Sequence, residues 1–330
     1  MFSRTKVVAG FAAAALFLTA CTSDSGTDSD GTTTAASGDD AYSIGINQLV
    51  QHPALDAATA GFKEVLDEAG VEVTYDEQNA NGEQATALTI AQQFAGKDLD
   101  LVLSVATPAA QATAQNITDI PVLFTAVTDP VSAELVDSEE APGGNVTGTS
   151  DVAPIEDQLD LLKELVPDAQ KVGIVYASGE VNSQVQVELA QEAAGPRDLE
   201  IVTQTVTTAN DIQQAVEALG DVDAIYVPTD NMVVAGIASL VQVAEQKQIP
   251  VIAAEAGTVE GGAVATLGID YTELGRQTGE MALRILQDGE DPASMAVEKA
   301  TEFTYVINED AAERLGVTIP QEILDEAETV

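Results

Sequence analysis

Short apolar runs alternate with amphipathic segments from Ala41 onward, and this alternation restricts the possible folds more than any other feature of the chain. Residues 43–46 form a first apolar run, and residues 53–69 place apolar side chains on one face at helical spacing until Gly70. Strands that alternate with helices are typical of a parallel sheet covered by helices. The next strands are expected at residues 71–75, 99–105 and 121–125, with helices at 83–95 and from Pro108.

A second series of the same kind follows residues 145–148, which predict a strand that crosses between two lobes. About 290 residues follow position 40, which is more than one hydrophobic core usually serves, so two domains are expected. Periodicity alone does not assign the last elements, near residues 263–268, 274–286 and 302–307, to either lobe. The strands of the second series are expected at residues 171–176, 201–206, 224–227 and 251–253.

Polar residues follow several of the predicted strands at the point where each strand ends. In an open sheet of parallel strands, ligands bind beyond the carboxyl ends of the strands. These residues therefore predict a binding cleft at one edge of the fold. They are the pairs His52-Pro53, Thr107-Pro108, Asp129-Pro130 and Asp230-Asn231.

The N-terminus has the pattern of a secretory signal. Arg4 and Lys6 precede the apolar residues 7–18, a stretch too short to span a bilayer in the mature protein. The stretch ends in Leu-Thr-Ala-Cys21, which resembles a bacterial lipobox. We expect a signal peptide over residues 1–20, a lipid on Cys21 and a flexible linker over residues 21–40, which leaves the protein extracytoplasmic and anchored to the cell membrane. An inert buried cysteine is the alternative.

The chain carries 55 acidic and 12 basic residues, a formal net charge of −43. This charge argues against nucleic acid and against anionic membrane surfaces as partners. A solvated acidic surface adapted to salt is favoured over recognition of a polycation, because net charge bears on solubility more than on fold.

The sequence gives little support to an enzyme. Cys21 is the only cysteine and His52 the only histidine, so a Cys–His pair is lost once Cys21 is lipidated. Spacing typical of metal ligands is missing, and residues 47–53 contain no glycine where a dinucleotide-binding fingerprint would need it. We expect no cofactor, no metal and no catalytic residue. A hydrolase using Asp and His is the least favoured alternative.

Seven ordered segments resemble the substrate-binding proteins of ABC transporters with the type I periplasmic-binding fold, in the group that includes tryptophan- and tyrosine-linked lipoproteins. The likeness extends from about residue 44 to residue 319. The segments are residues 52–56 (HPALD), 106–111 (ATPAAQ), 124–131 (FTAVTDPV), 143–148 (GGNVTG), 179–183 (GEVNS), 228–231 (PTDN) and 268–275 (GIDYTELG).

This resemblance implies an α/β fold of two Rossmann-like, doubly wound parallel-sheet lobes joined by three crossings. The crossings are expected near Thr149, Ala265 and Pro292. The N-terminal lobe would then comprise residues 41–150 plus 265–292, and the C-terminal lobe residues 151–264 plus 293–330. The lobes of such proteins close on a ligand like a hinge.

The resemblance further implies a lipid-anchored receptor of an ABC importer, which captures a small polar ligand and delivers it to permease and ATPase subunits. The expected ligand is an amino acid, with aromatic amino acids included. A sugar receptor of an ABC importer and a ligand-sensing surface lipoprotein are the alternatives, because each needs the same two-lobed clamp.

The expected binding residues divide the two charges of an amino acid between the lobes. Thr107 and the amide groups of its helix would hold the carboxylate, and Asp230 would hold the ammonium group from the other lobe. Helix capping is the alternative for both, and a structural role is favoured for Asp270. The full set of candidates is His52, Thr107, Thr128, Asp129, Glu180, Asn182, Ser183, Asp230, Asn231 and Asp270.

Overall fold

The computed structural model describes residues 41–330, which contain two sheets. All strand pairs of the first sheet are parallel, because helices connect most of its strands. Its strands, in spatial order, are β11 (Glu298–Lys299), β5 (Val146–Ser150), β4 (Val122–Thr125), β3 (Leu101–Val105), β1 (Tyr42–Gln48) and β2 (Val73–Asn79).

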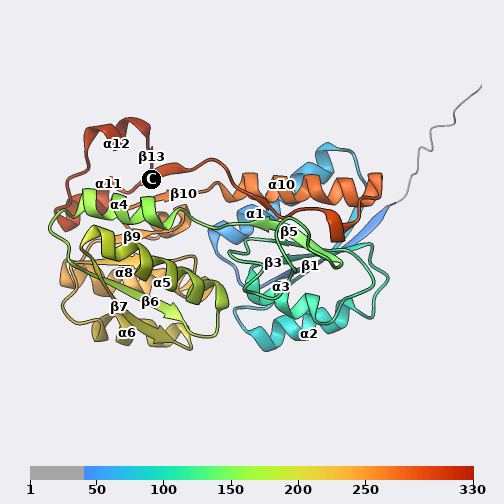
Figure 1. The fold of residues 1–330 in the computed structure, drawn as a ribbon, viewed down its shortest axis with the longest axis horizontal. Helices are drawn as coiled ribbons and strands as arrows, with labels where there is room; N and C mark the ends of the chain where they lie inside the picture. Colours follow the sequence, from blue (N-terminus) through green and yellow to red (C-terminus); the bar gives the residue numbers. More distant parts are fainter. Residues whose placement is uncertain (1–40) are drawn as a thin grey trace, which may run out of the picture. The chain divides into compact units, whose positions relative to one another are not determined.

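Helices cover both faces of the first sheet, as expected for a doubly wound fold. Figure 1 shows α1 (Pro53–Glu68) and α10 (Tyr271–Leu283) on one face, and α2 (Gln84–Phe94) and α3 (Thr107–Ala114) on the other. Phe62 of α1 and Phe94 of α2 are fully buried. The apolar strands between the two helix layers form the core of this lobe.

The second sheet contains seven strands, and only β10 and β12 pair antiparallel. Its order is β13 (Glu328–Thr329), β12 (Thr304–Ile307), β10 (Ala265–Gly268), β9 (Val251–Ala253), β8 (Ala224–Val227), β6 (Lys171–Ala177) and β7 (Glu200–Val206). Two apolar clusters lie against this sheet. Its helices are α4 (Ile155–Leu165), α5 (Val181–Ala194), α6 (Ile212–Ala218), α7 (Asn231–Ala235), α8 (Ile237–Lys247), α9 (Ala256–Glu260), α11 (Glu309–Leu315) and α12 (Gln321–Glu326).

The two doubly wound parallel-sheet lobes are confirmed, but two of the three crossings lie later in the chain than expected. The first crossing follows β5, close to Thr149. β10 pairs with β9 in the second sheet, so the second crossing comes after Gly268 and not at Ala265. β11 pairs with Thr149 and Ser150 in the first sheet, so the third crossing comes after Lys299 and not at Pro292. A four-residue apolar strand and a two-residue strand carry no periodicity that assigns them to a sheet.

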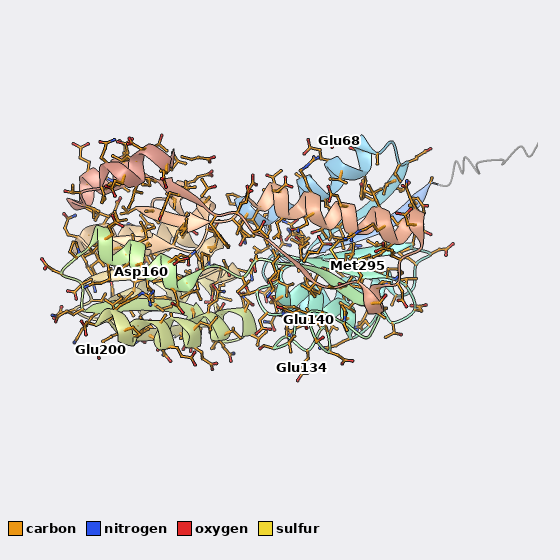
Figure 2. All side chains as sticks on the ribbon, turned by 45° about the horizontal axis from the view of Figure 1, so that its top comes forward. Glu68, Glu134, Glu140, Asp160, Glu200 and Met295 are labelled. Carbon is orange, nitrogen blue, oxygen red and sulfur yellow. The ribbon has the colours of Figure 1, made fainter. Side chains whose placement is uncertain are left out.

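Acidic side chains cover both lobes, as expected for a solvated acidic surface. Figure 2 labels five of them, Glu68, Glu134, Glu140, Asp160 and Glu200, and all five are exposed. Within residues 41–330, no helix is both long and apolar enough to cross a membrane.

Helices α1 and α10 pack so closely that only glycine fits at their contact. A Cβ atom on Gly275 of α10 would lie 2.0 Å from the carbonyl oxygen of Ala58, and one on Gly61 of α1 would lie 2.1 Å from the carbonyl oxygen of Thr272. Thr278 of α10 also shares a buried hydrogen bond of 2.8 Å with Thr149 at the end of β5. The helix after the second crossing is therefore fixed to the strand before the first crossing.

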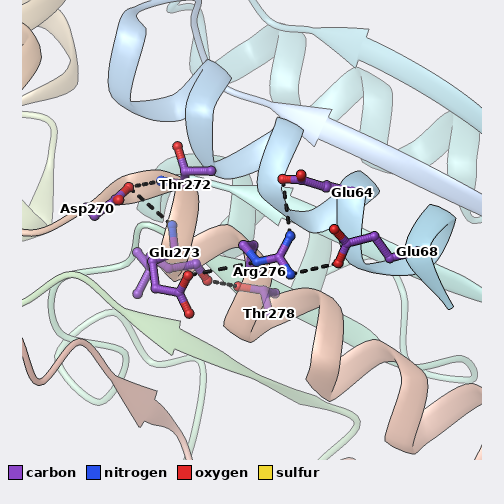
Figure 3. Close-up of polar contacts among 8 residues, drawn as sticks. Glu64, Glu68, Asp270, Thr272, Glu273, Arg276 and Thr278 are labelled. Carbon is purple, nitrogen blue, oxygen red and sulfur yellow. Dashed lines mark hydrogen bonds and ion pairs between the residues drawn. The ribbon is translucent and has the colours of Figure 1, made fainter.

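Arg276 adds an ionic contact at the edge of the same joint. Figure 3 shows its guanidinium between Glu64 and Glu68 of α1, at 3.2 Å and 2.8 Å, with Glu273 of α10 at 3.8 Å. These carboxylates are exposed, and exposed ion pairs usually contribute about 1 kcal/mol or less. The close backbone packing therefore holds the joint more than the ion pairs do.

We predict that Gly275→Ala lowers the free energy of unfolding by about 1–3 kcal/mol, because the new methyl group must push the two backbones apart. Urea unfolding of the purified protein measures this loss. The matched control is Gly195→Ala, at a residue with helical φ of −56° and no atom within 4 Å of its built Cβ. The control should leave stability unchanged or raise it by up to about 1 kcal/mol. Equal stability of the two variants would contradict the close packing.

Candidate functional site

Two cavities lie where the strand ends of the two sheets meet. The larger, here called the inter-lobe cavity, measures about 690 Å³ and is lined from one side by Leu49, Val50 and Pro108 and from the other by Glu180 and Met232, among others. The smaller, here called the hinge cavity, measures about 10 Å³. Asn231 lines both cavities. The remaining residues of the hinge cavity are His52, Leu55, Ala126, Asp151, Thr229, Val234, Glu255 and Tyr271.

A directed chain of hydrogen bonds runs between the lobes and ends on Asp151. Gln186 Nε2 donates to Thr229 Oγ1 at 2.6 Å, and Thr229 lies 3.3 Å from Thr128 Oγ1. Thr128 gives its only hydroxyl proton to Asp151 Oδ1 at 2.9 Å, so Thr229 must be the donor to Thr128. Tyr271 donates to Asp151 Oδ2 at 2.8 Å. Both carboxylate oxygens of Asp151 therefore accept, which is the pattern of an ionised group.

Asp151 is nevertheless buried without a cationic partner. Its side chain is 4% exposed, and none of the ion pairs within residues 41–330 involves it. Burial raises the pKa of Asp151, and the hydrogen bonds from Tyr271 and Thr128 oppose that rise. A carboxylate has about four lone-pair sites, so each oxygen can accept one more hydrogen bond. The geometry is suited to a cationic donor that enters the hinge cavity.

His52 and Glu255 complete the polar lining of the hinge cavity. His52 is 9% exposed, and neither of its ring nitrogens makes a hydrogen bond within the described residues. Burial lowers the pKa of His52 to about 4, so the ring is neutral at neutral pH. Glu255 is 2% exposed and accepts a hydrogen bond of 2.7 Å from the Gly257 amide as well as one from the Thr258 hydroxyl. Burial raises the pKa of Glu255.

Asp230 caps helix α7, which is the role that the sequence offered as the alternative to ligand binding. Its Oδ1 accepts from the Val233 amide at 2.8 Å at the start of α7, and its Oδ2 accepts from the Ala177 amide at 2.5 Å. The side chain is fully buried and lines neither cavity. Both of its oxygens bind backbone of its own lobe, so the geometry does not favour the expected contact with an ammonium group.

Glu180 and its neighbours form a second buried polar cluster, which borders the inter-lobe cavity. Glu180 Oε2 accepts from Asn231 Nδ2 at 2.6 Å, and its Oε1 accepts from the Met232 amide at 3.2 Å. Asn182 donates to Glu180 Oε2 at 3.2 Å and to the Thr229 carbonyl at 3.0 Å, while its own Oδ1 accepts no hydrogen bond from the part of the chain that the structure describes. Ser183 lies 3.3 Å from the same amide nitrogen. Glu180 therefore holds Asn231 directly at the edge of the inter-lobe cavity, and Asn182 and Ser183 support Glu180.

The remaining expected residues differ in their placement. Thr107 is the first residue of α3 and not its cap, and its buried hydroxyl has no hydrogen-bond partner among residues 41–330. The cap is Ala106, whose backbone at φ 79° and ψ 153° is strained for a residue other than glycine. Asp129 binds the Val131 and Ser132 amides, and Asp270 binds the amides of Thr272 and Glu273. Asp129 and Asp270 act as local caps and line neither cavity.

Asp151, Thr229, Glu255 and Tyr271 line the hinge cavity but were missed by the sequence reasoning. The signal was present, because Asp151 follows β5 directly and Glu255 comes two residues after β9. His52 was selected because it is a polar residue that follows a strand end. The same criterion would have selected Asp151 and Glu255. Tyr271 carries no such signal, because its role depends on the packing of α10 against α1.

We predict that Glu180 makes the ligand-free protein less stable as the pH rises from 6.5 to 8. Burial and the charge of Asp230 raise the pKa of Glu180 from 4.5 to about 8. The folded state therefore binds more protons than the unfolded state in this range, and the free energy of unfolding falls with pH by up to about 1.4 kcal/mol per pH unit for one full proton. His52 is neutral in the folded state across this range.

Glu180→Gln should flatten that pH dependence, measured by urea unfolding at pH 6.5, 7.25 and 8. The matched control is Glu200→Gln, at an exposed position on β7, which should keep the slope of the unaltered protein. An unchanged slope in the Glu180 variant would contradict the assignment.

Comparisons with known proteins agree with this architecture. The family model described as ABC transporter substrate binding protein matches residues 43–330. A tyrosine-binding protein of Clostridioides difficile (strain R20291) is 39% identical over 305 residues, which cover 91% of this chain and 88% of that protein.

Two solved structures extend the comparison. The ABC domain from Streptococcus pneumonia in complex with L-Trp is 37% identical, with a TM-score of 0.85 over 88% of this chain and all of that one. A ligand-free, open structure of a substrate-binding protein with adhesive properties from Clostridium difficile is 42% identical, with a TM-score of 0.68 over 88% of this chain and 99% of that one. The chain thus belongs to the ABC transporter substrate-binding protein family and is the substrate-binding protein of an ABC transporter, with the type I periplasmic-binding fold.

Proposed function

We propose that this protein captures an aromatic amino acid between its two lobes and delivers it to the permease and ATPase subunits of an importer. The names of the tyrosine-binding relative and of the L-Trp complex support this ligand class. The family is one of transport proteins and not of enzymes, and its members work outside the cytoplasm.

The buried carboxylate of Asp151 beside the hinge cavity is the single observation that carries the proposal. A cavity of about 10 Å³ is near the lower limit for one water molecule, and an ammonium group is of similar size. An ammonium group there would neutralise Asp151, whose buried charge has no cationic partner among the described residues. The inter-lobe cavity, which shares Asn231 with it as a lining residue, has ample volume for an aromatic ring.

Helix N-termini of the first lobe support the binding of the ligand's carboxylate. α1 begins at Pro53 with no side-chain cap, and its N-terminal turn borders the hinge cavity through His52 and Leu55. α3 begins at Thr107, also without a side-chain cap. The free amides of a first helical turn attract anions, so Thr107 is proposed to lie near the carboxylate, while His52 faces the hinge cavity.

The lining of the cavities disfavours a sugar. Sugar rings usually need an aromatic face, yet Tyr271 is the only aromatic residue that lines either cavity, and it is buried with its hydroxyl bound to Asp151. Sensing of the same ligand for a signalling partner stays an alternative to transport, because both uses need the same clamp.

We predict that L-tyrosine, L-tryptophan or both raise the melting temperature of the purified protein. A ligand bound only by the folded state stabilises it by about 2.7 kcal/mol at a hundredfold excess over Kd. A thermal-shift screen of the twenty amino acids with glucose, galactose and ribose as controls measures the effect. A response to sugars alone, with none to aromatic amino acids, would refute the proposed ligand class.

We also propose that the protein is a lipoprotein anchored through Cys21, although residues 1–40 lie outside the described residues. The proposal depends on the lipobox-like sequence alone. Cys21→Ala should leave the precursor uncleaved or release the protein from the membrane fraction, as followed by mass and by fractionation. Thr22→Ala is the matched control and should be processed normally. Normal processing and membrane retention of the Cys21 variant would refute the anchor.

A further inference from the structure

We propose that this site selects its ligand by a primary ammonium group and not by a carboxylate, so that aromatic amines such as tyramine and tryptamine are also ligands. This inference deepens the proposed function, because it concerns the same site and names the chemical class that the site accepts. Amino acids belong to that class because they carry the ammonium group, and their deaminated acids do not belong to it.

The ionisable side chains around the site, His52 apart, are all acidic. Four acidic side chains cluster at the two cavities or directly behind them, and each is at most 5% exposed. Asp151 and Glu255 line the hinge cavity, Glu180 lines the inter-lobe cavity, and Asp230 caps α7, whose first residue is Asn231. Each of these carboxyl groups accepts hydrogen bonds from nearby groups of the protein. None of them has a cationic partner among the ion pairs of the described residues.

Basic side chains are missing from the lining of both cavities. None of the lysines and arginines of residues 41–330 borders either cavity. Most of them pair with surface carboxylates, as Arg276 does with Glu68 at 2.8 Å and Arg314 with Glu245 at 2.9 Å. A ligand carboxylate can therefore meet helix dipoles and neutral donors here, but no formal positive charge.

His52 is an independent observation that points to a ligand in the hinge cavity. It is buried, it borders the cavity, and neither ring nitrogen has a partner within the described residues. Because its ring is neutral at neutral pH, one ring nitrogen can accept a hydrogen bond from an ammonium group. A neutral imidazole adds no positive charge that would favour a carboxylate over an amine.

Size and charge together assign the parts of the ligand. The hinge cavity accepts a group of about one water molecule, which suits an ammonium group better than a planar carboxylate with two oxygens. The ammonium group then contacts Asp151, and the ring extends into the inter-lobe cavity. The carboxylate, where there is one, lies at the first-lobe helix N-termini. A ligand without the carboxylate loses only an interaction with the helix dipoles. A ligand without the ammonium group leaves Asp151 buried and without a cationic partner.

The test compares six ligands on the unaltered protein by titration calorimetry at pH 7. They are L-tyrosine, tyramine and 3-(4-hydroxyphenyl)propionate, and L-tryptophan, tryptamine and indole-3-propionate. In at least one series we expect the amine to bind within about tenfold of its amino acid, because a contact with screened dipoles is weaker than one with a buried charge. The deaminated acid should bind at least about thirtyfold more weakly than the amine.

Each other result has a defined meaning. A deaminated acid that binds as tightly as its amine overturns the inference, and so does an amino acid that binds when its amine does not, although amino-acid capture then stands. Amines that bind when both amino acids fail support the inference and refute the proposed function. Failure of all six ligands refutes both.

A pair of variants tests the assigned contact. Asp151→Asn should weaken tyramine binding at least about thirtyfold, because it removes the charge and keeps the size. Asp129→Asn is the matched control, since this residue also follows a strand of the first lobe but lines neither cavity. It should leave tyramine affinity unchanged. Equal affinity of the two variants for tyramine overturns the contact, and the ligand comparison on the unaltered protein decides the inference even where Asp151→Asn fails to fold.

Discussion

The carboxylate of Asp151 links the two lobes, the first crossing and the hinge cavity through its hydrogen bonds. It lies in the first crossing, directly after β5, and accepts hydrogen bonds from Thr128 of the first lobe and from Tyr271 at the start of α10. Through Thr128 it is also bonded to Thr229 of the second lobe. A buried carboxylate needs hydrogen-bond partners. Thr128 and Tyr271 donate to it directly, and Thr229 of the second lobe supports Thr128.

The joint between α1 and α10 gives these contacts a rigid base. The glycines of the joint let the two helices pack backbone to backbone, and Thr278 fixes α10 to the end of β5. Because α1 begins beside His52 and α10 begins at Tyr271, one rigid pair of helices sets the positions of both residues at the hinge cavity. A hinge movement of the lobes would then require change only in the short crossings and in the contacts that span the lobes.

The contacts between lobes indicate a closed arrangement. The side chain of Gln84 in the first lobe donates to the Gly179 carbonyl of the second at 2.9 Å, and Thr229 bonds to Thr128. The L-Trp complex has a TM-score of 0.85, whereas the open, ligand-free relative reaches only 0.68 despite its higher identity. Opening would separate Thr229 from Thr128 and expose Asp151 to water, so the proposed binding of a cation would be coupled to the stability of the closed form.

Much of the fold could be predicted from the sequence, because long helices and apolar strands carry strong periodicity. The predicted strand at residues 224–227, for example, is β8. Two of the three lobe boundaries could not be predicted, since the short strands β10 and β11 carry no pattern that assigns them to a sheet. The site was predicted in part: polar residues at strand ends do gather there, but whether Asp230 binds or caps depends on the position of the Ala177 amide, which only the folded sheet fixes.

A crystal structure of the protein with its bound amino acid or amine tests the central claim most directly. The ligand's nitrogen should lie within about 3 Å of a carboxylate oxygen of Asp151, with its ring in the inter-lobe cavity and any carboxylate toward the N-termini of α1 and α3. A ligand whose carboxylate occupies the hinge cavity, or one that binds without contact to Asp151, would contradict it.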